Sequence, residues 1–162
     1  MTVLVRKASG DETDIRILRE MLGWAADWRR VDLDERLLRD PNVVLYVDDW
    51  GRSGDAGVIA ENEEREPLGA AWYRRFCEAE HGYGFIAPEI PELSIAVSPE
   101  HRGRGVGTAL LNALVEQAEA EGAPALSLSV EDGNPALRLY ERLEFRRVGR
   151  VGSAWTMRRD LY

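Results

Sequence analysis

The sequence predicts a single domain of the α/β class, with helices packed on one mixed β-sheet. Strand-like and helix-like segments alternate along the chain, which is typical of this class. In the second half, a strand-like segment, a glycine-rich loop, a long helix and another strand-like segment follow one another, which predicts two parallel strands joined by a right-handed crossover. The 162 residues, 44% of them hydrophobic, are enough for one buried core and too few for a second domain, so one domain is expected over residues 1–162.

The first half of the chain is predicted to begin with a strand and a long helix and to end with a β-hairpin. Ile15, Leu18 and Leu22 recur at helical spacing and define the buried face of the long helix. After Asp40 and Pro41, a suitable N-cap and first-turn proline, a short helix is expected, although the β-branched residues there fit a strand equally well. The predicted elements are a strand at Thr2 to Lys7, helices at Asp11 to Trp28 and Leu33 to Leu38, the segment of either type at Asn42 to Asp49, and strands at Ala56 to Ala60 and Leu68 to Phe76.

The second half opens with a long connection, Cys77 to Pro91, whose residues show no regular period. Connections of this length in small domains are often functional. A helix is predicted to start near Val106 and to end at Gly122, which Pro124 follows. The other predicted elements are strands at Leu93 to Val97 and Ala125 to Val130, a helix after Asn134 and Pro135, and a closing hairpin of strands at Phe145 to Val151 and Ser153 to Arg158.

Three alternating glycines, Gly103, Gly105 and Gly107, lie between a predicted strand and the long helix. Such a loop directs unpaired backbone N–H groups and the positive end of the helix dipole at one point, which favours a phosphate-bearing ligand. A P-loop is excluded because no Lys-Ser or Lys-Thr pair occurs in the chain. A dinucleotide-binding fingerprint is weakened because Thr108 or Leu110 stands where its third glycine belongs.

The segment Arg102 to Gly107, which reads Arg-x-x-Gly-x-Gly, resembles the signature of the GNAT superfamily of acyl-CoA-dependent N-acetyltransferases. Glu92 to Glu100 is similar to the family's strand that runs into the cofactor loop, and Asn134 to Phe145 is similar to its downstream helix. The resemblance is strong over residues 91–150 and weak before residue 50. It implies a GNAT-like mixed sheet of about six or seven strands flanked by about four or five helices. The cofactor that it implies is acetyl-CoA (coenzyme A).

The same resemblance implies an activity. The protein is expected to transfer an acetyl group from acetyl-CoA to a primary amine of a small molecule or protein, by direct attack in a ternary complex. A protein N-terminal or lysine acetyltransferase is an alternative within this class. A non-catalytic acyl-CoA-binding regulatory module is an alternative from another class, because the cofactor motif would survive the loss of acceptor chemistry.

Site residues follow from the resemblance as well. Tyr140 is implied to be the general acid or a ligand of the cofactor sulfur, and the alternative is a half-buried helix aromatic. Glu92 is the candidate general base, directly or through water, and the alternative is a surface carboxylate at the start of a strand. Asn134 either holds the pantetheine arm, caps the following helix, or does both. The implied cofactor-binding residues are Ile95, Ala96 and Val97, where a strand distortion would expose N–H groups to the thioester carbonyl, then Arg102, Gly103, Arg104, Gly105, Val106, Gly107 and Thr108, and finally Asn134 and Tyr140.

The acceptor side is defined less sharply. His81 and Glu89, in the long connection, are weaker candidates for the base. The N-terminal helix, which carries Trp24 and Trp28, lines the acceptor pocket in relatives, and Tyr83 and Phe85 lie in the long connection. The resemblance is thus compatible with an aromatic acceptor site for a cationic amine, without assigning that site to individual residues.

The composition of the chain favours some classes of binding partner over others. The chain has 21 basic and 29 acidic residues, and its net charge of −8 disfavours nucleic acid or an anionic membrane and favours a cationic substrate. Apolar runs are too short to span a membrane and residues 1–7 lack a secretory hydrophobic segment, so a cytoplasmic protein is expected. Cys77 is the only cysteine, so neither an intrachain disulfide nor a metal-binding cysteine motif is expected. The oligomeric state is not defined by the sequence, which is compatible with a homodimer.

Glu144 departs from the family pattern, because relatives commonly have glycine just before the Phe that starts the next strand. If the preceding helix ends there in a left-handed conformation, a residue other than glycine costs on the order of 1 kcal/mol.

Overall fold

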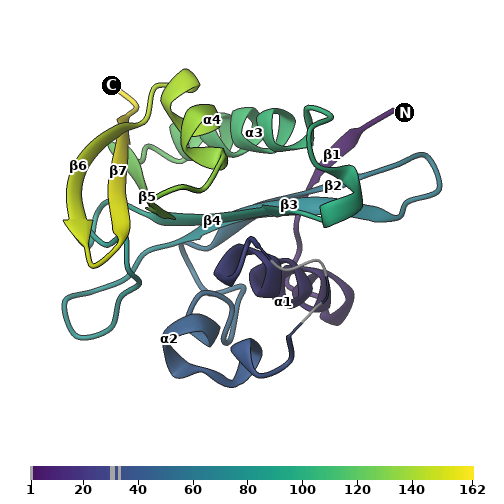
Figure 1. Ribbon diagram of the computed structural model, residues 1–162, viewed down its shortest axis with the longest axis horizontal. Helices are drawn as coiled ribbons and strands as arrows, with labels where there is room; N and C mark the ends of the chain where they lie inside the picture. Colours follow the sequence, from purple (N-terminus) through teal and green to yellow (C-terminus); the bar gives the residue numbers. More distant parts are fainter. Residues whose placement is uncertain (1, 30–31, 33) are drawn as a thin grey trace.

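The computed structural model describes residues 2–29, 32 and 34–162. One seven-stranded mixed sheet crosses the molecule in the order β1-β2-β3-β4-β5-β7-β6, which confirms the α/β class (Figure 1). The strands are β1 (Leu4–Lys7), β2 (Ala56–Glu61), β3 (Pro67–Arg74), β4 (Glu92–Val97), β5 (Ala125–Glu131), β6 (Arg146–Val151) and β7 (Ala154–Asp160). The α-helices are α1 (Glu12–Ala26), α2 (Pro41–Val44), α3 (Val106–Ala120) and α4 (Ala136–Arg142), and 3₁₀ turns occur at Leu37–Arg39 and Pro99–His101.

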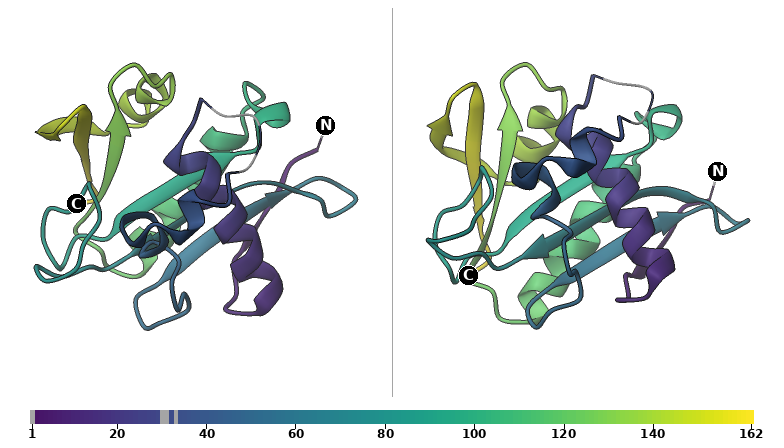
Figure 2. Two further views of the ribbon diagram at one scale, coloured as in Figure 1. Left: turned by 60° about the horizontal axis from the view of Figure 1, so that its bottom comes forward. Right: turned by 90° about the horizontal axis from the view of Figure 1, so that it is seen from below.

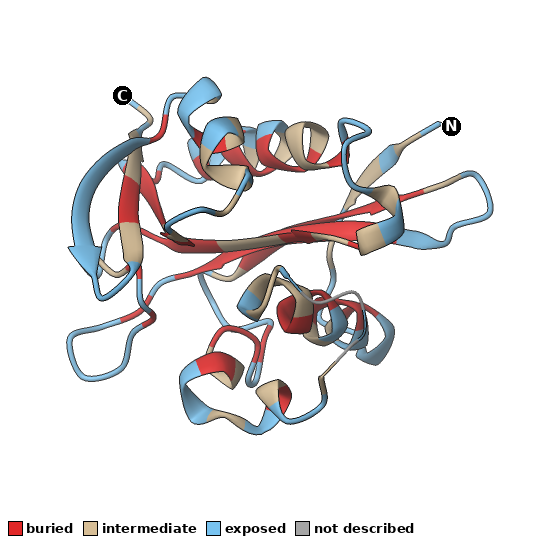
Figure 3. Cartoon of the chain, viewed as in Figure 1, coloured by how far each residue is buried: buried red, intermediate tan, exposed pale blue. Residues whose placement is uncertain are grey.

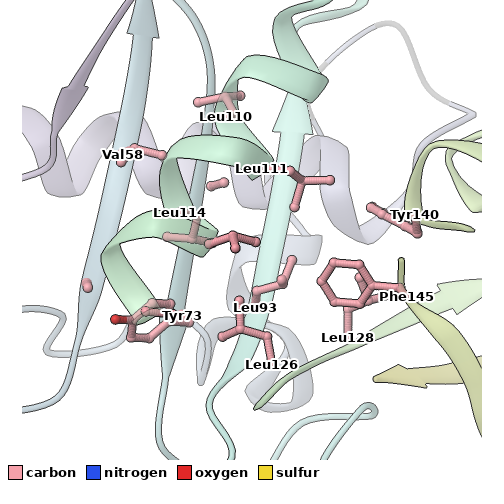
Figure 4. Packing of buried hydrophobic residues seen from close by; sticks show 14 of the residues in the cluster. Val58, Tyr73, Leu93, Leu110, Leu111, Leu114, Leu126, Leu128, Tyr140 and Phe145 are labelled. Atoms are coloured by element: carbon pink, nitrogen blue, oxygen red, sulfur yellow. The ribbon is translucent and has the colours of Figure 1, made fainter. Parts of the chain in front are cut away.

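Helices cover both faces of the sheet (Figures 1 and 2). Helix α3 packs on β2, β3 and β4 beside α4, whereas α1 packs on β3 and β4 from the opposite face, where α2 also lies. Leu110, Leu111 and Leu114 of α3 are fully buried against the sheet (Figure 4). Burial is concentrated in the central strands, whereas the edge strand β6 is exposed throughout (Figure 3). None of the helices in the described part of the chain is long and apolar enough to cross a membrane.

Strands β4 and β5 run parallel, as the crossover order predicts. Their only paired positions among the described residues are Glu92 and Ser127, near the beginnings of the two strands. The backbone N–H of Ser127 also donates to the carbonyl of Pro91 at 3.0 Å. Beyond this point the strands separate, so a cleft opens toward their carboxyl ends, where ligands of α/β sheets bind.

The helix expected at Leu33 to Leu38 is wrong over the part that the structure describes; Leu33 itself lies outside the described residues. The Asp34 carboxylate accepts the backbone N–H of Arg36 at 3.0 Å, which favours a turn over a helix. A single 3₁₀ turn follows, and it stops at Asp40, which is extended at ψ 120°. The cause is Pro41, because a proline disfavours the α conformation in the residue before it.

The segment after Asp40 forms a helix. The carboxylate of Asp40 accepts the N–H of Asn42 at 2.9 Å and caps α2, with Pro41 in the first turn. Hydrogen-bonded turns continue after Val44, which excludes the strand that was equally compatible with the sequence. Helix α1 ends at Ala26, slightly before the predicted end, and Trp28 lies in the turn beyond it.

Helix α4 ends at a residue in the left-handed conformation, Glu144, with φ 71°. The N–H of Phe145 donates to the carbonyl of Tyr140 at 2.9 Å, and the N–H of Glu144 donates to the backbone carbonyl of Glu141 at 3.1 Å. These two bonds form a Schellman motif, which normally contains glycine at the position of Glu144. The left-handed stop, which the sequence left as a condition, is therefore present at Glu144.

Candidate active site

A cavity of about 1400 Å³ occupies the cleft between β4 and β5. Its walls come from β4, the start of α3, the end of β5, α4, the turn between β6 and β7, and the C-terminal part of α1. Of the predicted site residues, the following line it: Glu92, Ile95, Ala96, Val97, Arg102, Gly103, Gly105, Val106, Gly107, Thr108, Asn134 and Tyr140. Arg104 is exposed and lies outside the described wall, so its contact with a cofactor stays a prediction.

The glycine loop has the geometry of an anion site. Gly103 and Gly105 have φ values of 75° and 83°, which side chains rarely allow, and the space around both is open. Gly105 is the N-cap of α3 and provides no side-chain cap, so the N–H groups of the first helical turn remain free for a ligand. At Gly107 a Cβ would lie 3.1 Å from Leu139, so this glycine serves the packing of α3 on α4.

Arg102 is engaged within the protein. Its Nε donates to the carbonyl of Val97 at 3.1 Å, and its Nη1 donates to the carbonyl of Trp28 at 3.0 Å. Partial burial lowers the pKa of the guanidinium. Arg102 therefore links the glycine loop to the segment just after α1, a role that the sequence did not indicate.

The backbone of β4 offers hydrogen-bond donors on one edge. Strand β4 pairs with β3 without a register shift, from Gly69 opposite Val97 to Arg74 opposite Glu92. The free N–H groups therefore belong to the other edge, which faces the cleft after β5 has turned away. The distortion expected at Ile95 to Val97 is therefore absent: Ile95 and Val97 turn their N–H groups to the cleft, whereas the N–H of Ala96 faces β3.

Tyr140 lies on α4 at the wall of the cavity. Its side chain is buried, and its ring packs edge-on against Phe145 with centroids 6.1 Å apart (Figure 4). Burial raises the pKa of the hydroxyl, so the phenol is neutral at physiological pH. No group in the described part of the chain takes a hydrogen bond from this hydroxyl, which therefore remains available as a donor.

Asn134 caps the start of α4. Its Oδ1 accepts the N–H of Ala136 at 2.9 Å, as expected for a capping residue before proline. Its position on the cavity wall leaves the amide nitrogen available for a second contact.

Glu92 is buried, with an exposed fraction of 1%, so the alternative of a surface carboxylate is wrong. Its Oε2 accepts hydrogen bonds from the hydroxyl of Tyr46 and, at 3.0 Å, from the N–H of Gly84. The other oxygen, Oε1, is buried and takes no hydrogen bond of normal geometry among the described residues, although the backbone of Gly82 lies close enough to the carboxylate to lower its pKa. Burial raises the pKa of the carboxyl, and the hydrogen bond from Tyr46 opposes that change.

The other candidates for the base are less well placed. His81 stacks on Phe85 with centroids 4.4 Å apart, and its Nδ1 lies 2.9 Å from the carbonyl oxygen of Gly82. Both His81 and Glu89 are exposed and lie outside the described wall of the cavity.

Of the four aromatic residues named from the sequence, Trp24, Trp28 and Tyr83 line the cavity, whereas Phe85 lies outside its described wall. The indole N–H of Trp28 donates to Glu131 at 3.3 Å, which brings the end of α1 to the end of β5. Sequence reasoning missed Tyr46, which also lies on this wall.

Comparison with known proteins identifies the family. Residues 18–145 match the model of the Acetyltransferase (GNAT) family, and the chain belongs to this family. It is 32% identical to an L-2,4-diaminobutyric acid acetyltransferase of Nocardia farcinica and 33% identical to an L-methionine sulfoximine/L-methionine sulfone acetyltransferase of Pseudomonas aeruginosa, in both cases over 68% of this chain. The matches cover 65% and 62% of those relatives, less than two thirds of their length. An N-acetyltransferase structure from Staphylococcus aureus Mu50 has the same fold, with a TM-score of 0.74, 19% identity and coverage of 100% of both chains.

Proposed function

We propose that this protein transfers an acetyl group from acetyl-CoA to the primary amine of a small molecule. One observation carries the proposal: a single cavity holds the free first turn of α3, the hydroxyl of Tyr140 and the carboxylate of Glu92. The printed substrates of the two curated relatives are amino acids or their analogues, which supports a small amine as acceptor. Acceptance of an amino-acid amine is accordingly part of the proposal.

The residues present fit coenzyme A. The first turn of α3 and the loop at Gly103 and Gly105 would hold its phosphates, because free N–H groups and the helix dipole favour an anion there. Asn134 would hold the pantetheine arm through its side-chain amide. When bound, acetyl-CoA supplies the acetyl group as a thioester.

Each part of the chemistry has a residue in the cavity. The backbone N–H groups of Ile95 and Val97, on the open edge of β4, would polarise a carbonyl oxygen. Glu92 would accept the proton of the acceptor amine as its nitrogen bonds to the acetyl carbon. Tyr140 would give a proton to the sulfur that leaves as the carbon–sulfur bond breaks.

A thiol-release assay across amino acids, polyamines, aminoglycosides and peptides tests this function. Thiol release that depends on a small amine is expected, and release with peptides alone would indicate a protein acetyltransferase. Binding of coenzyme A without amine-dependent release would indicate a regulatory module. With the best amine, Glu92→Gln is expected to remove the acidic limb of the pH profile of kcat/KM, and an unchanged limb would exclude Glu92 as the base.

A further inference from the structure

The hydroxyl of Tyr46 lies between Glu92 and the connection 77–91. It donates a hydrogen bond to Oε2 of Glu92 and accepts one from the backbone N–H of Tyr83 at 2.9 Å. The N–H of Gly84 donates to the same carboxylate oxygen at 3.0 Å. One oxygen of Glu92 thus has two donors, one from the α2 region and one from the connection.

Tyr46 is itself held in place. Its carbonyl oxygen accepts the indole N–H of Trp72 at 3.0 Å, and its ring meets Phe76 edge-on, with centroids 5.6 Å apart and planes at 88°. The side chain is 8% exposed. These contacts fix the direction of the hydroxyl before any ligand binds.

Two glycines of the connection are required by this arrangement. A Cβ at Gly82 would lie 2.1 Å from the hydroxyl oxygen of Tyr46 and 2.6 Å from Oε1 of Glu92. A Cβ at Gly84 would lie 2.5 Å from the backbone of Leu128 in β5. The connection therefore packs directly on Tyr46 and Glu92, and no side chain larger than hydrogen fits at either position.

We propose that Tyr46 is a positioning residue for Glu92: its hydroxyl and the N–H of Gly84 occupy Oε2, so that Oε1 is the oxygen that takes the proton of the acceptor amine, directly or through water. This inference rests on the proposed function, in which Glu92 is the general base. Tyr46 follows α2 and is distant in sequence from Glu92, which begins β4. Its hydroxyl therefore also joins the α2 region of the cavity wall to the proposed base.

Other charged groups near Glu92 do not replace this contact. Arg74 stands opposite Glu92 in the register of β3 and β4, but its guanidinium is paired with Asp55 at 2.9 Å and donates to carbonyls of residues 45, 48 and 49. His81 in the connection favours the ionised carboxylate through its charge only when it is protonated. Tyr46 is thus the side-chain hydrogen-bond donor of Glu92 within the described residues.

The variant Tyr46→Phe keeps the ring and removes the hydroxyl. Loss of a hydrogen bond to the ionised carboxylate should raise the pKa of Glu92 and move the acidic limb of kcat/KM to higher pH, by roughly one pH unit. The KM for acetyl-CoA should not change. The matched control is Tyr73→Phe, because the hydroxyl of Tyr73 also donates to a glutamate, Glu121, away from the cavity. An unchanged limb in Tyr46→Phe, or an equal shift in Tyr73→Phe, would overturn the proposal.

A second replacement at position 46 should shift the acidic limb of kcat/KM in the opposite direction. With 3,5-difluorotyrosine incorporated at position 46, the phenol keeps its shape and becomes a stronger donor, so the limb should move to lower pH. A purely structural role for Tyr46 predicts no such shift. This variant also decides the question if Tyr46→Phe does not fold.

Direct titration of Glu92 separates this inference from the proposed function. The ¹³C resonance of its side-chain carboxyl, assigned by its absence in Glu92→Gln, should titrate at higher pH in Tyr46→Phe than in the unmodified protein. If Glu92→Gln keeps the acidic limb, Glu92 is not the base and its proposed role fails. The titration still decides whether Tyr46 controls the carboxylate, and an identical midpoint in both proteins would refute that control.

Discussion

Arg102 donates a hydrogen bond of 3.0 Å from its Nη1 to the carbonyl oxygen of Trp28. The two residues are 74 positions apart, one in the cofactor loop and the other just after α1. The indole N–H of Trp28 in turn donates a hydrogen bond to Glu131 at the end of β5. The glycine loop and the aromatic wall at Trp28 are therefore joined through one guanidinium.

Replacement of this arginine should affect the acceptor. In Arg102→Ala the KM for the amine is expected to rise roughly 5- to 10-fold, because a hydrogen bond worth about 1 kcal/mol no longer holds Trp28. Steady-state kinetics with the best amine measures the effect. Affinity for coenzyme A should fall more at low than at high salt, since that contribution is ionic. The control Arg104→Ala should show only the salt-dependent change, and an unchanged amine KM in Arg102→Ala would contradict the link.

Gly105→Val should abolish detectable binding of coenzyme A. A side chain at this N-cap obstructs the first turn of α3, and φ 83° adds a strain of about 1–2 kcal/mol. Gly122→Val provides a control of equal kind at the other end of α3, where φ is 78° and the space is also open. Calorimetry on both folded variants should show loss of binding in the first and retention in the second. Equal affinities would exclude the loop as the phosphate site.

Glu144→Gly should stabilise the protein by about 0.5 to 1 kcal/mol, because glycine adopts φ 71° without strain. The contact that is lost is weak: the carboxylate lies 3.5 Å from Arg159 and its side chain is 80% exposed. Thermal denaturation measures the change. Glu144→Ala, which loses the ion pair but keeps the strain, should not be stabilised, and a rise in Tm there would point to another cause.

The form of the glycine loop could be predicted because its residues are contiguous in sequence. The space around Gly103 and Gly105 is open, as the absence of side chains indicated, and both glycines also have positive φ. The strand before them and the helix after them also occur where the periodicity placed them. Local sequence pattern is sufficient here, since the loop and the first turn of the helix are neighbours in the chain.

The buried contacts of Glu92 and Arg74 could not be predicted in this way. Tyr46 and Glu92 are 46 residues apart, and no spacing rule relates an α2 turn to a strand start. Arg74 is a similar case: it falls in a strand that reads as apolar, and its burial makes sense only with Asp55 and three distant carbonyls in place. Tertiary hydrogen bonds of this kind leave no periodic signal in the sequence.

The ion pair of Asp14 and Arg6 makes stability depend on pH. Hydrogen bonds from Arg6 and Ser9 lower the pKa of the buried Asp14 from 3.8 to about 2. The stabilisation, on the order of 2 kcal/mol, is complete above the unfolded value and is lost as the pH falls through the folded one. The measurement is denaturant unfolding from pH 7 to pH 2. Asp14→Asn should have a lower free energy of unfolding than the unmodified protein at pH 7, and this difference should disappear near pH 2. Asp160→Asn serves for comparison: its ion pairs also lower the pKa of the carboxyl, but they lie at the surface, so its deficit should be smaller than that of Asp14→Asn at neutral pH. A deficit in Asp14→Asn that stays constant down to pH 2 would show that the effect is not titration of this carboxylate.

Tyr140→Phe tests the proton donor. The ring should keep its packing against Phe145, so the fold and the dissociation constant of coenzyme A should remain nearly unchanged. The kcat should fall roughly 10²-fold, within the range for a positioned general acid. The loss should shrink with a thioester whose leaving thiol is more acidic, because that thiol needs less help from a proton. If Tyr140→Phe weakens cofactor binding and leaves the single-turnover rate intact, Tyr140 is a packing residue and the proton comes from solvent.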